Sequence, residues 1–170
     1  MLKLLGALCV MAGALWCGTG AIGGLRRRAQ TLGELHGSLV WLEEEMTFRM
    51  APLPQLLEQL GKDRQGEVSR FFQETARSLQ RDPEGGLYPS WRQAMVRYLP
   101  LLHQEERQVL LEVGQTLGRY DVQTQRQALS RGARRLATFR DEARGEVKRL
   151  GRVYAALSLA GGAAVVLVLV

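Results

Sequence analysis

The segment 31–46, TLGELHGSLVWLEEEM, decides the fold class. Its large apolar residues recur every three or four positions, at Leu32, Leu35, Leu39, Leu42 and Met46. This spacing places them on one face of an α-helix. We expect this helix to continue from the apolar stretch before it and to end near Met50, because Pro52 and Pro54 follow.

The same spacing continues along the middle of the chain and predicts four short helices followed by a long one. The apolar positions of the short helices are Leu56, Leu57 and Leu60; Val68, Phe71, Phe72, Ala76 and Leu79; Trp91, Ala94, Met95 and Tyr98; and Val109, Leu110, Val113 and Leu117. Gly61 should end the first of these helices, and Ser90 should begin the third, with Gln93 completing a capping box. A loop is expected at residues 82–86, DPEGG.

The last helix carries a seam of apolar residues at three-to-four spacing, which resembles one edge of a coiled coil. The seam comprises Val122, Leu129, Leu136, Phe139, Ala143, Val147 and Leu150. No stretch of the chain alternates polar and apolar residues with the two-residue period of a strand. The sequence therefore predicts an all-α fold, a compact bundle of about six helices.

Both ends of the chain are apolar, and almost every charge lies between Arg26 and Arg152. Residues 4–25 and 153–170 contain no charged side chain. A bilayer core about 30 Å thick needs roughly 20 helical residues, so each run is expected to span a membrane. We expect three regions: an N-terminal transmembrane helix (1–26), a cytoplasmic helical domain (27–152) and a C-terminal transmembrane helix (153–170).

Basic clusters flank the two apolar runs on the side of the middle region. They are Arg26, Arg27 and Arg28 after the first run, and Lys148, Arg149 and Arg152 before the second. Basic flanks are retained on the cytoplasmic side of a membrane, so the middle region should be cytoplasmic. A basic cluster directly after the first run also disfavours a cleaved signal peptide.

No constellation of catalytic or metal-binding residues is evident. The two histidines, His36 and His103, fall on separate predicted helices, and both cysteines, Cys9 and Cys17, lie within the first apolar run. A phosphate loop is absent, because Lys-Ser or Lys-Thr does not follow Gly85-Gly86. We therefore expect no enzymatic activity, no metal, no cofactor and no small-molecule substrate.

Charged residues point to protein and membrane contacts instead of nucleic acid. The net charge is +6, but no nucleic-acid recognition motif or base-stacking aromatic cluster occurs. Glu43, Glu44 and Glu45 are consecutive, and consecutive helical residues point in different directions. They are expected to form a solvated face or an acidic docking surface.

The segment 114–125, GQTLGRYDVQTQ, predicts a tight corner between two helices. Gly114 and Gly118 lie one helical turn apart, which allows another backbone to approach, and Gly118 suits a helix end. Asp121 is placed to cap the next helix, and Gln125 lies one turn further on the same face. The corner is either purely structural, or it also presents Asp121 and Gln125 to a partner.

The pattern G-x-x-L-G-x-x-D-x-x-x-Q at Gly114, Leu117, Gly118, Asp121 and Gln125 resembles the stage III sporulation protein AB family. Other features are similar to that family as well: the opening MLKLLGA, the acidic helix through Glu43 and Glu45, the Pro52-Leu53 turn, Trp91, and an apolar run at each end.

The resemblance implies a place in the mother-cell membrane around the forespore, as part of a channel related to secretion systems. It also implies a cytoplasmic domain similar to the platform protein of type II secretion and type IV pilus machines. By that analogy the chain is a non-enzymatic platform that binds a cytoplasmic sporulation ATPase and other membrane proteins of the channel complex.

Three other functions compete with this platform role. A generic two-span scaffold differs from it only in the identity of the partner. A membrane enzyme with an unrecognised site lacks a His, Cys or Asp constellation, and a pore-forming protein would need a polar stripe that neither apolar run carries.

Overall fold

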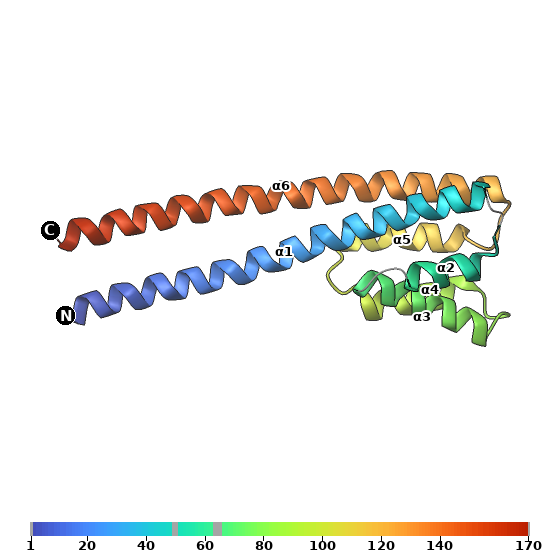
Figure 1. Cartoon of the computed structure of the whole chain (residues 1–170), viewed down its shortest axis with the longest axis horizontal. Helices are drawn as coiled ribbons and strands as arrows, with labels where there is room; N and C mark the ends of the chain where they lie inside the picture. Colours follow the sequence, from blue (N-terminus) through green and yellow to red (C-terminus); the bar gives the residue numbers. More distant parts are fainter. Residues whose placement is uncertain (1, 49–50, 63–65, 170) are drawn as a thin grey trace. The chain divides into compact units, whose positions relative to one another are not determined.

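The computed structural model describes the backbone of residues 2–48, 51–62 and 66–169, and the side chains of residues 23–48, 51–62 and 66–153 (Figure 1). Within these residues six helices occur and no strand, so the all-α prediction is confirmed. The helices are α1 (Leu2–Phe48), α2 (Leu53–Lys62), α3 (Glu67–Arg81), α4 (Leu87–Tyr98), α5 (Gln104–Thr116) and α6 (Val122–Leu169).

The chain forms two compact units, which are described separately. Unit 1 comprises Met1–Ala29 and Asp141–Val170, and unit 2 comprises Gln30–Arg140. The long helices α1 and α6 contribute residues to both units, whereas α2 to α5 belong to unit 2. The boundaries expected from charge, at 26/27 and 152/153, stay predictions.

The leucines that decided the fold class form the centre of unit 2. Leu32, Leu35, Leu39 and Leu42 have no exposed surface, and Met46 is half-buried. On α6, Gly132 brings the helix close to its neighbours: a Cβ there would lie 2.6 Å from Val113 Cγ2 of α5 and 3.3 Å from Leu39 Cδ1 of α1. The parts of α1, α5 and α6 in unit 2 therefore pack together through one apolar seam.

A second layer of unit 2 consists of α2, α3 and α4 (Figure 1). Trp91 of α4 joins this layer to α5. The Trp91 ring is fully buried, with its centroid 4.7 Å from that of Phe71 and 5.9 Å from that of Phe72, both in edge-on contact. The indole Nε1–H donates to the Leu110 carbonyl oxygen at 2.9 Å. Trp91 thus satisfies its polar atom while its ring connects α3, α4 and α5.

Two helix boundaries differ from the sequence prediction. Helix α4 begins at Leu87, so Ser90 lies within it and donates its hydroxyl to Ser78 Oγ at 2.9 Å instead of capping the helix. The earlier start is possible because Pro89 falls in the first turn, where a missing N–H costs nothing. Helix α2 extends one residue beyond Gly61, to Lys62; Gly61 is buried, and a Cβ there would lie 2.8 Å from Gln73 Cβ of α3.

The seam predicted on α6 is present over part of its length. Leu129, Leu136 and Ala143 have no exposed surface, Phe139 and Val147 are half-buried, and Val122 is 54% exposed. Val122 is exposed because it is the first residue of the helix and follows the corner directly.

The two predicted membrane spans fall almost entirely outside the residues whose side chains are described. The backbone is helical there, since α1 begins at Leu2 and α6 ends at Leu169. In the described part of the chain, no helix is long and apolar enough to cross a bilayer. The two spans therefore stay a prediction.

Candidate functional site

The α5–α6 corner (residues 114–125) turns the chain between the two helices through a tight turn at residues 116–119. Leu117 has φ −64° and ψ 132°, Gly118 has φ +76°, and the Arg119 N–H donates to the Thr116 carbonyl oxygen at 3.4 Å. These angles define a type II turn, which needs a positive φ at its third residue and therefore favours glycine. The prediction that Gly118 ends the helix has this physical basis.

The Gln125 side chain is buried in the corner and bonds to its backbone. Its Oε1 accepts the Gly118 N–H at 3.1 Å, and its Nε2 donates to the Tyr120 carbonyl oxygen at 2.6 Å. Only 8% of Gln125 is exposed. One amide side chain thus bonds two backbone groups of the loop that no helix satisfies, as buried polar groups require.

Asp121 caps α6, as its position in the sequence indicated. Its Oδ1 accepts the Thr124 N–H at 3.0 Å, and its Oδ2 accepts the Thr124 hydroxyl at 2.6 Å. The bond from the Thr124 hydroxyl, followed by that from its N–H, lowers the pKa of Asp121 below its ordinary value of 3.8. The carboxylate is exposed and adjoins two exposed apolar side chains, Tyr120 (59%) and Val122 (54%).

Gly114 provides the space in which Trp91 lies against α5. A Cβ at Gly114 would lie 2.5 Å from Trp91 Cδ1 and 2.8 Å from its Nε1. The close neighbour at this glycine is therefore an aromatic ring from α4, and not the backbone that the spacing of Gly114 and Gly118 predicted. Leu117, the remaining position of the motif, is fully buried.

All five motif residues have a structural role in the α5–α6 corner, and they differ in what they expose. Gln125 is buried and its amide is bonded within the corner, whereas Asp121 faces solvent. Contact between the corner and a partner stays a prediction, and Asp121 with its two apolar neighbours is the part of the motif that is accessible for it.

The three consecutive glutamates on α1 do not share one environment. Glu44 is exposed, while Glu43 and Glu45 are half-buried. Glu43 lines a groove together with Arg126, Arg131 and Arg134 of α6. The acidic docking surface thus stays a prediction, and Glu44 is its most accessible member.

The basic clusters predicted to orient the membrane spans lie in unit 1. Arg28 forms an ion pair with Glu146, with 3.6 Å between Nη1 and Oε2. The other members are exposed: Arg26, Arg27, Lys148, Arg149 and Arg152. Their exposure leaves them accessible to anionic headgroups, although the orientation itself stays a prediction.

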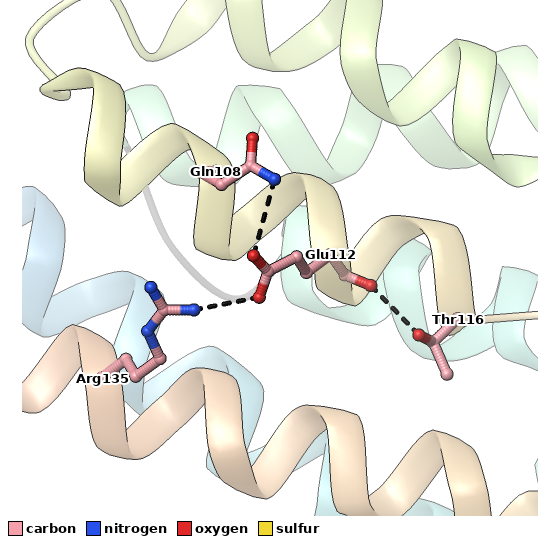
Figure 2. Close-up of polar contacts among 4 residues, drawn as sticks. All are labelled: Gln108, Glu112, Thr116 and Arg135. Carbon is pink, nitrogen blue, oxygen red and sulfur yellow. Dashed lines mark hydrogen bonds and ion pairs between the residues drawn. The ribbon is translucent and has the colours of Figure 1, made fainter.

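A polar seam between α5 and α6 was not predicted from the sequence. Figure 2 shows its centre, Glu112, whose Oε2 lies 2.9 Å from Arg135 Nη1. Glu112 also accepts the Gln108 amide at 3.5 Å, and its backbone carbonyl accepts the Thr116 hydroxyl at 3.0 Å (Figure 2). Arg135 and Glu112 are each half exposed, so this pair holds the helices weakly.

The histidines lie apart and offer no joint site. His36 Nδ1 donates to the Ala133 carbonyl oxygen at 2.9 Å, which places it at the interface of α1 and α6, whereas His103 precedes α5 and is exposed. Among the side chains that the structure describes, no group of three or more His, Cys, Asp or Glu residues is placed to hold a metal ion.

Comparison with known proteins connects this architecture to one family. The family model for stage III sporulation protein AB matches residues 3–170. Stage III sporulation protein AB of Bacillus subtilis (strain 168) is 28% identical over 123 residues, which cover 71% of each chain. A solved structure of stage III sporulation protein AB has a TM-score of 0.65 at 22% identity, covering 72% of this chain and 97% of that one; it supports the fold alone.

Proposed function

The chain belongs to the stage III sporulation protein AB family, and we propose that it is a non-enzymatic membrane platform of a sporulation channel between mother cell and forespore. In this role its helical domain couples a cytoplasmic ATPase to the membrane assembly. The family match over residues 3–170 carries the proposal, because it includes both apolar ends and the whole helical domain.

The construction of unit 2 supports a mechanical role. A platform must transmit force without deforming, and close-packed interiors have low compressibility. Here Trp91 is buried between α3, α4 and α5, and the α5–α6 corner is fixed by the Gly118–Gln125 and Asp121–Thr124 bonds. A displacement applied to the short helices would therefore pass through α5 to α6.

The proposed placement has both ends of the chain in the mother-cell membrane around the forespore and the middle region in the cytoplasm. The basic clusters at the two ends of the middle region support it, since basic flanks stay on the cytoplasmic side. A reporter fused near residue 90 that is active only in the cytoplasm tests the orientation. Activity of a reporter that works only outside the cytoplasm would contradict it.

Binding to the ATPase is tested with the full chain in detergent and the purified sporulation ATPase. We expect saturable binding that is weakened by Asp121→Ala, which alters the exposed end of the corner, or by Glu43→Lys, which alters the acidic helix. Glu84→Lys is the matched control, because Glu84 is exposed in the loop between α3 and α4. Circular dichroism of each variant confirms that it is folded.

Failure of a well-folded full chain to bind the ATPase would contradict the coupling role. The protein would then be a two-span scaffold of the channel whose partners are other membrane proteins. Hydrolytic activity of the purified chain itself would contradict the non-enzymatic role.

A further inference from the structure

A polar groove of about 310 Å³ lies between α1 and α6 in unit 2. One wall is Glu43 of α1, and the other is formed by α6 with Arg126, Arg131 and Arg134 among its residues. We call this feature the basic groove. Neither the family motif nor the acidic helix accounts for it.

The arginines of the basic groove are not neutralised within the described part of the chain. Residues 122–140 contain five arginines and no Asp or Glu. Arg135 is paired with Glu112, but no carboxylate among the described side chains lies within ion-pair distance of Arg126, Arg131 or Arg134. The groove therefore concentrates positive charge on one side of the helix.

Arg126, one of the arginines that line the groove, has hydrogen-bonding capacity that the described residues do not use. Its Nε has no exposed surface and no hydrogen-bond partner among the described residues, and its Nη1 reaches only Gln123 Oε1 at 3.5 Å. A buried donor without an acceptor costs free energy, which an incoming carboxylate would recover. Guanidinium groups match carboxylates in shape and bind them through two parallel hydrogen bonds.

We propose that the basic groove binds an acidic segment of a partner protein. Gln127 and Ser130 also line it and supply hydrogen-bonding groups for a peptide backbone. The groove is concave, and this shape suits an extended peptide better than a flat anionic lipid surface.

Glu43 allows binding in the groove to be distinguished from general attraction between opposite net charges. Its carboxylate opposes an acidic ligand in the groove, so removing its charge strengthens binding. Glu44 is exposed and does not line the groove, so the same substitution there has no such effect. This proposal does not depend on which protein is the partner, and it stands whether or not the ATPase binds.

The test uses the full chain in detergent and a short fluorescein-labelled peptide that alternates glutamate with alanine, followed by fluorescence anisotropy. Reversal of two exposed arginines, Arg131→Glu with Arg134→Glu, should weaken binding roughly tenfold, since it replaces attraction by repulsion at two contacts. The matched control is Arg70→Glu with Arg77→Glu, two exposed arginines of α3 with the same change in net charge. It should change the affinity by less than about threefold.

The glutamate pair provides the second arm of the experiment. Glu43→Gln should raise the affinity for the peptide by about two- to threefold, while Glu44→Gln should leave it unchanged. All four variants change exposed or half-buried side chains, and circular dichroism shows whether each is folded.

Three results would overturn the proposal. The first is that the full chain does not bind the acidic peptide at all. The second is that reversal of the α3 arginines weakens binding as much as reversal in the groove, which would show attraction by net charge alone. The third is that the groove reversal affects binding of phosphatidylglycerol added to the micelles but not of the peptide, which would make the groove a lipid site.

Discussion

Replacement of Gly114 by alanine tests the packing at the centre of unit 2. The added Cβ would lie 2.5 Å from Trp91 Cδ1, 2.8 Å from Nε1 and 2.9 Å from Cγ, about 1 Å inside the usual carbon–carbon separation. The indole ring has little room to withdraw, because it is fully buried and the ring centroids of Phe71 and Phe72 lie 4.7 Å and 5.9 Å from its own.

The expected change in the free energy of unfolding combines two destabilising effects with one stabilising effect. Overpacking of a filled core costs about 1–3 kcal/mol. Displacement of the indole also weakens its bond to the Leu110 carbonyl, a loss of about 1 kcal/mol. Alanine in place of glycine inside a helix returns about 1 kcal/mol. Gly114→Ala should therefore lower the free energy of unfolding by about 1–3 kcal/mol.

Urea unfolding of residues 27–152, followed by circular dichroism, measures this change. A loss of about 2 kcal/mol shifts the midpoint by roughly 1 M at a slope of about 2 kcal/mol/M. Gly33→Ala is the matched control, because its Cβ would make an ordinary contact 3.5 Å from Arg140 Cδ. It should be neutral or stabilising by up to about 1 kcal/mol. A Gly114→Ala midpoint equal to or above that of the wild type would refute the packing argument.

Three further predictions concern the corner and the seam beside it. Gly118→Ala should cost about 1–2 kcal/mol of unfolding free energy through its φ of +76°, and Gly118→Asn should cost less in the same urea assay. Asp121 has a folded-state pKa below its ordinary 3.8. Its carboxylate therefore stabilises the fold fully above the ordinary pKa, and this stabilisation is lost as the pH falls through the folded-state pKa. The stability difference between wild type and Asp121→Asn, measured by thermal unfolding, should therefore change only below about pH 4; a change confined to neutral pH would be inconsistent with this assignment. A double-mutant cycle of Glu112→Gln and Arg135→Gln should give a coupling of about 0.2–1 kcal/mol, and a value several times larger would show that the pair is shielded from water.

Features that depend on local chemistry were predictable from the sequence. The leucine spacing at residues 32–42 identified the buried face of α1, because helical periodicity is a property of the segment alone. Gly118 and Asp121 were identified for the same reason: a positive φ and an N-cap are set by residues within a few positions.

Features that depend on packing between distant segments were not predictable. Gly61 was expected to end α2, but its role is to admit Gln73 of α3. Nothing in the residues around Gly114 indicates that the ring beside it belongs to Trp91, twenty-three positions earlier. The basic groove is indicated in the sequence by five arginines without a carboxylate in residues 122–140. That Glu43 forms the facing wall is evident only once α1 and α6 pack together.

The coupling role is tested most directly by the turnover of the sporulation ATPase in the presence of this protein. The full chain, reconstituted in liposomes, is titrated into the ATPase at fixed ATP, with Asp121→Ala and Glu84→Lys proteins measured beside the wild type. We predict that the wild type and Glu84→Lys change the rate of ATP hydrolysis to a plateau, that Asp121→Ala shifts that plateau to higher protein concentration, and that liposomes without ATPase hydrolyse nothing. A rate of hydrolysis that stays constant at every concentration of the folded wild-type protein would contradict the account.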